Sequence, residues 1–477
     1  MIQWGINALN HDASLSVFHD GVPVFASHSE RFSKIKNDSF LCQELINYAL
    51  IYGTPDEITW SEKPYLKKAR QLITLDERVF DITPKSHLKR LGICQNITYV
   101  NHHESHAAAA AYTSNFNKAL IFVFDGIGEF DTISTWKYEN YKLNCIYRQS
   151  YYHSLGLFYS AFTKLIGLKP NEEEFILMGM AGYGQPLYKD QLIDTFFDIS
   201  YPDIHLKQNL HSGVSFKYVN KFDLAASVQK VYEELTQGIC SYFQAQYNID
   251  NACFSGGCVL NCMANSTYSK IFKNVWIYPN AGDAGNSYGA VLSILKSKTT
   301  YNPYIGYNIN DEIDTDDVVN ALINGKVVGI ANGKAEFGPR ALGNRSLIAD
   351  PRTENIQDIV NLIKKREEFR PFAPTILEEH FSNNFITDTK QSRFMNFVYH
   401  NKYPDTYKGI THIDGSSRVQ TLNADSNTVF REILLKWYDK TGVPLLLNTS
   451  LNIKGQPLVN DKRDAQEFSK KYSITVF

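Results

Sequence analysis

The stretch Leu120-Ile121-Phe122-Val123-Phe124-Asp125-Gly126-Ile127-Gly128-Glu129 decides the class of fold. Its five consecutive apolar residues predict a buried strand, and the aspartate and two glycines after them predict a turn-rich loop at the strand end. An acidic residue at a strand end, followed by glycines, is how α/β folds present a carboxylate to a bound metal–nucleotide. The sequence therefore predicts an α/β protein with a polar site at this strand end.

Just upstream, Val100-Asn101-His102-His103-Glu104-Ser105-His106 precedes a run of alanines. His102 and His106 are four residues apart, so a helix here places both imidazoles on one face, about a turn apart. Such a pair suits a transition metal or the phosphates of a nucleotide, and together with a carboxylate it suits iron, zinc or manganese. A lone His-x-x-x-His is more often structural, so these residues alone leave both interpretations open.

The first thirty residues predict a β-meander. Ile2–Asn7 is apolar, Leu15–His19 and Val22–Ser27 alternate, and Asp20-Gly21 predicts a hairpin turn between the last two. A strand pair joined by a tight turn resembles the entry element of the actin, sugar-kinase and chaperone ATPase architecture. Helical periodicity over Leu224–Tyr247 predicts a helix long enough to lie across a sheet.

The chain has 477 residues, of which 43% are hydrophobic, which is enough for two or three packed domains. Between Lys298 and Asp311 it turns polar and turn-rich, which predicts a boundary between domains at 1–300 and 312–477. Beyond the boundary, Asp316–Ile323 predicts a helix and Lys326–Ala331 a strand. The second domain is therefore expected to be α/β as well.

Composition indicates a cytoplasmic protein. The seven cysteines form no Cys-x-x-Cys pair, and the first residues enter a strand without the pattern of a signal peptide. No run of about twenty apolar residues is present, so no membrane partner is expected. The net charge of −2 argues against bulk affinity for nucleic acid. A homodimer is compatible with the sequence.

Three glycine-bearing segments are predicted to follow strands of the first domain: Asp125–Gly128, Ser255–Cys258 and Ala281–Gly285. Glycine lets backbone amides approach a phosphate or adenosine without a Cβ in the way. One such segment is typical of an ordinary turn. Three such segments in one domain, two of which contain an aspartate, are equally compatible with a nucleotide site and with ordinary turns.

The second domain holds arginines among turn-forming residues. Arg340 and Arg345 lie in Glu336–Ser346, Arg366 and Arg370 flank Glu367-Glu368-Phe369, and Arg418 ends Asp414-Gly-Ser-Ser-Arg. Arginines fixed in this way suit bidentate recognition of a phosphate or carboxylate, although salt bridges to neighbours such as Glu336 or Asp350 are the alternative. Leu445–Ser450 predicts a buried strand whose last three side chains form either a helix cap or the floor of a polar pocket.

His11 follows the first strand in Asn10-His11-Asp12-Ala13-Ser14. A histidine in a strand-end loop of a nucleotide-binding domain is a candidate general base, because its ordinary pKa lies near neutrality. A hydrogen-bonded loop histidine without a chemical role is the alternative.

Taken together and in order, the motifs resemble the ATP-dependent carbamoyltransferases, the family of nodulation protein U, cephem O-carbamoyltransferase and tobramycin carbamoyltransferase. The resemblance runs from about Ile2 to Asp464. It rests on a dozen ordered motifs, among them His11-Asp12-Ala13-Ser14, Glu30-Arg31-Phe32, His102-His103-x-x-His106, Asp125-Gly-x-Gly-Glu129, Gly256-Gly257-x-x-x-Asn261, Gly282-Asp283-Ala284-Gly285, Phe337-Gly-Pro-Arg-Ala-Leu-Gly-Asn-Arg-Ser346, Phe369-Arg-Pro-Phe-Ala-Pro374 and Asn448-Thr-Ser-x-Asn452.

The resemblance implies an actin-like (ASKHA) ATPase domain, similar to the tRNA threonylcarbamoyl-transferring protein, followed by a YrdC-like α/β domain. It also implies that carbamoyl phosphate and ATP, with Mg²⁺, give a carbamoyl-adenylate in the second domain. The adenylate passes to a metal-bearing site in the first domain, where a hydroxyl attacks it and AMP leaves. Iron(II) is the expected ion.

Site residues follow from the same resemblance. The implied metal ligands are His102, His106, Asp125 and Asp283, and His11 matches the base that deprotonates the acceptor. The expected nucleotide-binding residues are Gly126, Gly128, Gly256, Gly257, Asn261 and Gly282, and the expected carbamoyl-phosphate residues are Arg340, Arg370, Arg418, Asn448 and Ser450. The chain departs from the family at Phe175-Ile176 and Met180-Ala181-Gly182, where a tyrosine–lysine pair is common.

The acceptor is expected to be a hydroxyl of a small molecule, a sugar or a modified nucleobase. The alternatives are a transferase acting on hydroxymethylated bases in DNA, a tRNA threonylcarbamoyl-type transferase, and a nucleotide-binding regulator without transfer chemistry. For DNA, a basic and aromatic stretch at Lys63–Arg90 could hold the backbone, unless it is an ordinary solvated helix face. Its residues are Lys67, Lys68, Arg70, Lys85, Lys89 and Arg90, with Tyr65, Phe80 and His87.

Overall fold

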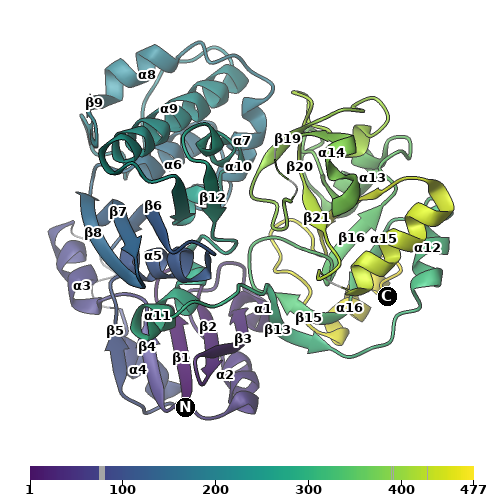
Figure 1. Cartoon of the computed structure of the whole chain (residues 1–477), viewed down its shortest axis with the longest axis horizontal. Coiled ribbons are helices and arrows are strands. Elements are labelled where there is room, and N and C mark those ends of the chain that lie inside the picture. Colours follow the sequence, from purple (N-terminus) through teal and green to yellow (C-terminus); the bar gives the residue numbers. More distant parts are fainter. Residues whose placement is uncertain (75–80, 388, 390, 427) are drawn as a thin grey trace. The chain divides into compact units, whose positions relative to one another are not determined.

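The computed structural model describes residues 1–74, 81–387, 389, 391–426 and 428–477 (Figure 1). The chain forms two compact units. The first comprises Met1–Ser29 and Asn37–Tyr301, and the second comprises Glu30–Lys36 and Asn302–Phe477. Both units combine helices and sheets, so the predicted α/β class is confirmed.

The first unit holds two five-stranded sheets with the same strand order. In each sheet three antiparallel strands follow one another along the chain, and two later strands extend the sheet by parallel pairing from the first strand of that meander. The order β3-β2-β1-β4-β5 is made by β1 (Ile2–Asn7), β2 (Ser14–His19), β3 (Val22–His28), β4 (Glu57–Trp60) and β5 (Ile97–Tyr99). The order β12-β11-β6-β7-β8 is made by β6 (Lys118–Gly128), β7 (Asp131–Glu139), β8 (Lys142–Ser150), β11 (Asn251–Ser255) and β12 (Asn274–Ile277).

The predicted meander at the N-terminus is confirmed, whereas the loop predicted directly after Phe124 is wrong. β6 continues through Gly126 to Gly128, because Gly128 still pairs with Asp131 of β7 beyond a shift of register. The carboxylate of Asp125 therefore projects from an extended strand.

Two helices lie between the sheets, α5 (His102–Thr113) and α11 (Asn286–Leu295) (Figure 1). They pack closely because Gly289 has no side chain: a Cβ there would lie 2.0 Å from the carbonyl oxygen of Ser105. The first sheet is also covered by α2 (Gln43–Ala49), and the unit includes α3 (Pro64–Ile73) and α4 (Pro84–Arg90).

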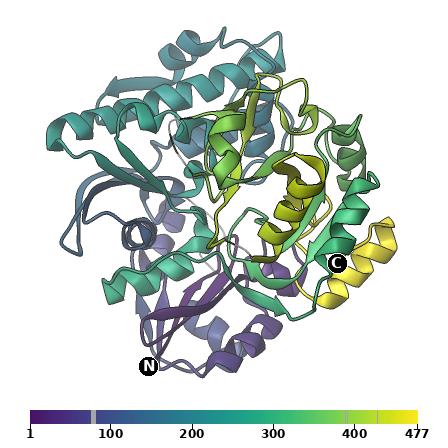
Figure 2. The same cartoon turned by 45° about the vertical axis from the view of Figure 1, so that its right-hand side comes forward.

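The helices α6 (Leu155–Leu165) and α9 (Lys221–Tyr247) pack on β6, and α9 is the long teal helix of Figures 1 and 2. It confirms the long helix expected near Leu224–Tyr247. The remaining elements of the unit are α7 (Glu174–Ala181), α8 (Lys189–Phe196), the hairpin β9 (Phe197–Ser200) and β10 (Asp203–Leu206), and α10 (Cys262–Asn265).

The second unit is built on a mixed sheet of order β14-β16-β22-β17-β21. Its core joins the sheet to helices at residues such as Ile330, Leu446 and Trp437. The strands are β14 (Val328–Ala331), β16 (Arg345–Ala349), β17 (Ala373–Leu377), β21 (Gln420–Leu422) and β22 (Leu445–Ser450), and the helices are α12 (Thr315–Ile323), α13 (Ile356–Lys364), α14 (Phe381–Asn384), α15 (Thr428–Thr441) and α16 (Lys462–Tyr472).

Two smaller sheets complete the second unit. β13 (Tyr304–Ile309) pairs with β15 (Gly333–Glu336), so the interval Lys298–Asp311, for which turns were expected, contains a strand. The second small sheet consists of β18 (Phe385–Ile386), β19 (Val398–Asn401) and β20 (Ser416–Arg418).

A short segment from the early part of the chain belongs to the second unit. We call Glu30–Lys36, which contains α1 (Glu30–Ser33), the strap. The Arg31 guanidinium donates to the carbonyl of Gly338 at 3.0 Å, Lys34 pairs with Asp464, and the ring of Phe32 lies 6.1 Å from that of Tyr307. The strap is thus anchored by charge, hydrogen bonding and ring contact.

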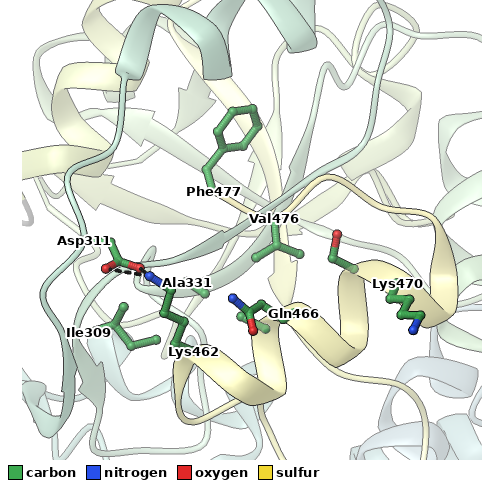
Figure 3. Close-up of a pocket in the computed structure, with 10 residues that line it drawn as sticks. Ile309, Asp311, Ala331, Lys462, Gln466, Lys470, Val476 and Phe477 are labelled. Carbon is green, nitrogen blue, oxygen red and sulfur yellow. Dashed lines mark hydrogen bonds and ion pairs between the residues drawn. The ribbon is translucent and has the colours of Figure 1, made fainter.

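A cavity of about 320 Å³ lies in the second unit beside α16 (Figure 3). Lys462 and Asp311 form an ion pair in its wall, and none of the predicted site residues lines it. All seven cysteines are free thiols. Within the described residues, each helix is too short or too polar to cross a membrane.

Candidate metal centre and anion site

Four predicted metal ligands come together between the two sheets of the first unit. α5 supplies His102 and His106, β6 supplies Asp125, and the turn before α11 supplies Asp283. One ligand atom from each lies within 4.8 Å of the others. His102 and His106 are fully buried and the two aspartates are almost so.

The separations between these atoms fit a single ion. His102 Nε2 lies 3.2 Å from His106 Nε2, 3.3 Å from Asp125 Oδ2 and 3.4 Å from Asp283 Oδ1. Atoms bound at about 2.0–2.2 Å to one ion are roughly 2.8–3.6 Å apart in octahedral or tetrahedral coordination. The nitrogen and oxygen donors suit zinc, iron or manganese.

The charges of the cluster favour a cation. Burial lowers the pKa of the His102 imidazole, but the carboxylates of Asp283 and Asp125 outweigh burial and raise that pKa well above its ordinary value. Against burial, the imidazoles of His102 and His11 hold the pKa of Asp283 well below its ordinary value. The two buried carboxylates thus favour positive charge at this place, which a divalent ion would supply on binding.

Two groups contact the predicted ligands in a role that the sequence analysis did not assign to them. The hydroxyl of Ser255 lies 3.1 Å from His106 Nδ1, which leaves Nε2 directed at the other ligands. The backbone amide of Gly257 donates to Asp125 Oδ1 at 3.1 Å. Ser255 is the last residue of β11 and Gly257 follows two residues later, so the strand-end pattern indicates the segment, whereas its contacts with His106 and Asp125 depend on the pairing of β11 with β6.

His11 lies in the loop between β1 and β2, beside this cluster. Its Nε2 is 3.5 Å from Asp283 Oδ2 and its Nδ1 is 3.1 Å from Asp12 Oδ2. Burial lowers the pKa of His11, but Asp283 and the hydrogen bond with Asp12 outweigh it, so the pKa rises to about 9. The side chain is 50% exposed, unlike His102 and His106, so a substrate can reach it.

Backbone contacts hold the His11 loop in place. The amides of Leu9 and Ala13 donate to the carbonyls of Ser39 and Asp38, both at 2.7 Å. Leu9 and Asp12 have left-handed backbone conformations, with φ of 67° and 56°. Such conformations are uncommon away from glycine and are concentrated at functional sites.

The predicted nucleotide-binding residues fall into two groups. Gly126 and Gly282 leave room where a Cβ would stand, whereas Gly128 has no space for one, because a Cβ would lie 2.3 Å from His102 Cδ2. Both polar atoms of the Asn261 side chain form hydrogen bonds within the protein. Its Oδ1 accepts from the amide of Ala264 in α10, and its Nδ2 donates to Gln229. Gly256 and Gly257 directly follow β11, near Asp125.

Among the predicted carbamoyl-phosphate residues, Asn448 and Ser450 lie on β22. Asn448 Nδ2 donates to Thr375 and Gln420, both at 3.0 Å, and contacts the carbonyl of Ala341. This ties it to the loop that carries Arg340. The strand continues to Ser450, so the helix cap considered for these residues is wrong.

Lys364, at the end of α13, was missed. Its ammonium donates to the carbonyl and hydroxyl of Ser450 and to the carbonyl and side-chain oxygen of Asn452, and it is buried. Burial, with Arg366 and Arg370 nearby, lowers the pKa of Lys364 well below its ordinary value.

The cations of this region lie close enough to repel one another. Burial, together with the charges of Arg370 and Arg418, lowers the pKa of Arg366 to about 8. Glu367 is the carboxylate of the group, and it pairs with Arg370 at 3.4 Å and with Lys454. The guanidinium groups of Arg366, Arg370 and Arg418 therefore lie beside a carboxylate that is shared with Lys454, and such an excess of cations suits an anion.

Arg345, the second arginine of the Phe337–Ser346 motif, has a structural role. It is fully buried and donates to backbone carbonyls that include those of Asn460, Asn332 and Tyr307. Glu336 fixes the same loop by accepting from three backbone amides. Asp350, which was considered as a partner for these arginines, forms an ion pair with Arg352 at 2.8 Å.

The basic stretch at Lys63–Arg90 is not a continuous exposed surface. Lys67 is buried and binds Glu62 and the carbonyl of Leu9, and Arg70 and His87 are buried too. Lys85, Lys89 and Arg90 remain exposed, whereas Phe80 lies outside the described residues.

Comparison with known proteins identifies the family. Residues 3–292 match the model "Carbamoyltransferase N-terminus" and residues 319–477 match "Carbamoyltransferase C-terminus". The chain therefore belongs to the carbamoyltransferase family and is a transferase.

Three relatives illustrate the range of similarity. An uncharacterised protein of Synechocystis is 32% identical across 97% of this chain and 93% of its own length. Nodulation protein NolNO of Sinorhizobium fredii is 29% identical, across 96% of this chain and 76% of the relative. The 3′-hydroxymethylcephem-O-carbamoyltransferase of Amycolatopsis lactamdurans is 32% identical across 46% of each chain.

Proposed function

We propose that this protein is an O-carbamoyltransferase that uses carbamoyl phosphate and ATP to carbamoylate a hydroxyl group of a small molecule. The observation that carries the proposal is the accessible imidazole of His11, 3.5 Å from Asp283, beside four buried metal-donor groups. A divalent ion bound to Asp283 would offset the carboxylate charge that raises the pKa of His11, and the neutral imidazole would then act as the proton acceptor beside the ion.

The first half-reaction is assigned to the second unit. Carbamoyl phosphate, ATP and water give carbamoyl-adenylate, phosphate and pyrophosphate, with Mg²⁺ accompanying ATP. Charge-assisted contacts from Arg370 and Arg418, and from Arg340 with Asn448 and Ser450 on the adjoining strand, would hold the anionic reactants. We assign this unit to the YrdC-like class by its place after the transfer domain.

The transfer step is assigned to the first unit, whose repeated sheet order supports the actin-like assignment. The acceptor oxygen forms a bond to the carbamoyl carbon of the adenylate, the bond from that carbon to the phosphate oxygen breaks, and AMP leaves. The hydroxyl proton passes to His11 Nε2. When bound by His102, His106, Asp125 and Asp283, a divalent ion, which we expect to be iron(II), supplies positive charge against the charge that develops on AMP.

A small-molecule acceptor is favoured over DNA. The cephem carbamoyltransferase is named for a hydroxymethyl group on a small molecule, and burial of Lys67 and Arg70 removes two cations from the surface that DNA would need. A tRNA threonylcarbamoyl-type transferase is disfavoured because the same chain carries the C-terminal carbamoyltransferase domain. The cytoplasmic location and the homodimer remain expectations.

The test of this function is a product assay on the metal-loaded full chain. Pyrophosphate release should require both ATP and carbamoyl phosphate, and AMP release should require an acceptor that gains one carbamoyl group in mass spectrometry. Pyrophosphate release without carbamoyl phosphate would contradict the proposal. For a DNA acceptor the logarithm of activity should fall with the logarithm of salt by about 0.9 per neutralised phosphate, whereas a small neutral acceptor should give a flat line.

A further inference from the structure

Asn286, the first residue of α11, presents a buried carboxamide to the four-donor cluster. Its side chain is fully buried, and Nδ2 lies 3.3 Å from His102 Nε2. Its Oδ1 has no hydrogen-bond partner among the residues that the structure describes. Buried amide oxygens without a partner are rare in native proteins, so this oxygen calls for a partner that the described side chains do not supply.

The contact between Nδ2 and His102 cannot persist once an ion is bound. His102 Nε2 faces His106, Asp125 and Asp283, so its lone pair points into the cluster and would be used by the ion. The amide hydrogens would then face a cation. A half-turn about the Cβ–Cγ bond exchanges Nδ2 and Oδ1 without changing the shape of the group.

After that rotation the amide oxygen occupies the position now held by Nδ2, 3.3 Å from His102 Nε2. The distances from His102 Nε2 to the other three donor atoms are 3.2, 3.3 and 3.4 Å. The oxygen of Asn286 would therefore lie as far from His102 Nε2 as the other three donor atoms do, which is the separation of two atoms bound to one ion.

We propose that Asn286 is a fifth protein ligand of this metal centre, through Oδ1. The inference rests on the metal centre of the proposed function and deepens it. A neutral amide adds a hard oxygen donor without adding charge, so two imidazoles, two carboxylates and one amide still balance a divalent ion. Five protein ligands suit iron(II) or manganese(II) better than four-coordinate zinc, and they leave one octahedral position for a substrate oxygen.

The local fold explains how this side chain reaches the cluster. Asp283 and Asn286 are three residues apart where the turn enters α11, as His102 and His106 are four apart on α5. Each pair therefore lies on one face of its helix. Gly289 allows α11 to approach the backbone of α5 at Ser105, which brings the two faces together.

The experiment is a Co²⁺ titration of the full chain, with visible absorption for coordination number and chelator competition for affinity. Asn286→Leu has nearly the same size but no donor atom, whereas Asn286→Asp keeps an oxygen. The leucine variant should bind Co²⁺ about tenfold more weakly or worse and absorb more intensely, because fewer ligands remain. The aspartate variant should bind at least as tightly as the natural protein and keep its spectrum.

The matched control is Ser287→Ala, the next residue of α11, whose buried hydroxyl contacts Ser16 and Ala284 away from the cluster. It should leave affinity and spectrum unchanged. Natural affinity and spectrum in Asn286→Leu, or a tenfold loss in folded Asn286→Asp, would overturn the assignment of Asn286 alone. Failure of the natural protein to bind Co²⁺, or undiminished binding in His106→Ala, would instead refute the metal centre.

Discussion

Ser255 contacts His106 Nδ1 at 3.1 Å, so the other ring nitrogen of His106 faces the remaining members of the four-donor cluster. We expect Ser255→Ala to weaken divalent-metal binding by about 10–100-fold, as is usual when the partner of a ligating histidine is lost. Chelator competition measures the change. Ser293→Ala, whose hydroxyl donates to Ala290 within α11, is the control, and an equal loss in both variants would contradict the prediction.

Sequence patterns predicted the members of the four-donor cluster better than the groups that contact them. His102 and His106 were indicated by their spacing and Asp125 by its place after a strand, because both signals are local. Asp283 required the family resemblance. Ser255 is separated from His106 by 149 residues, and only the pairing of β11 with β6 brings it to the site.

The basic stretch was predicted poorly for a related reason. Charge along the chain does not reveal which way a helix faces. In α3, Lys67 turns inward to bind Glu62 and the carbonyl of Leu9, two partners supplied by other segments. A buried, paired lysine and an exposed one look the same in the sequence.

Among the elements, the close packing of α5 on α11 can be tested at Gly289. A Cβ there would lie 2.0 Å from the carbonyl oxygen of Ser105 and 2.9 Å from Ala109 Cβ. Gly289→Ala should therefore lower the free energy of unfolding by about 1–3 kcal/mol and weaken metal binding, because the helices must separate. Denaturant unfolding and metal titration measure both effects.

Gly179→Ala is the matched control for that change. Gly179 lies within α7, and a Cβ there would meet no heavy atom within 4 Å. Alanine in an open helical position stabilises by about 0.5–1 kcal/mol. If Gly289→Ala behaved as Gly179→Ala does, close approach of the helices would not matter to the site.

The docking of α4 should depend on pH. Burial, with Arg90 nearby, lowers the pKa of His87 from 6.5, and Nε2 accepts a hydrogen bond from the amide of Leu41 at 3.2 Å. Below pH 6.5 the unfolded chain takes up the proton before the folded one does. The stability that neutral His87 contributes is therefore present above pH 6.5 and is lost as the pH falls toward the folded value.

Thermal unfolding from pH 7.5 to 5 measures this dependence. His87→Gln keeps an acceptor for Leu41 but cannot titrate, so its melting temperature should fall less than that of the natural protein across this range. His19→Gln changes an exposed histidine and serves as the control. Identical pH profiles for the natural protein and His87→Gln would show that His87 does not cause the fall in melting temperature.

For the whole molecule, the main prediction is a division of labour between the units. Arg418→Ala should reduce pyrophosphate release by about 10–150-fold, since a charge-assisted contact contributes about 1.5–3 kcal/mol. His11→Ala should preserve pyrophosphate release and abolish carbamoylation of the acceptor. Arg393→Ala, a more exposed arginine of the second unit 3.9 Å from Glu378, should resemble the natural protein. The reverse pattern would exchange the roles of the two units.

At this scale the α/β class was predictable, because buried apolar strands and long helices leave periodic signals. The order of the strands was not. The meander from β1 to β3 follows from adjacent hairpins, but the parallel pairing of β1 with β4 and of β6 with β11 joins distant segments. The assignment of the strap to the second unit was also missed, because nothing in the sequence of Glu30–Lys36 indicates which unit this segment joins.

The strap has a consequence for how such a chain can be divided. Seven residues near the start of the sequence complete a unit that otherwise begins at Asn302. No single cut of the polypeptide yields both units intact: a break at Tyr301–Asn302 leaves Arg31, Phe32 and Lys34 on one fragment and their partners Gly338, Tyr307 and Asp464 on the other. A fragment that is to contain the whole second unit must therefore include Glu30–Lys36, either in the same chain or as a separate peptide.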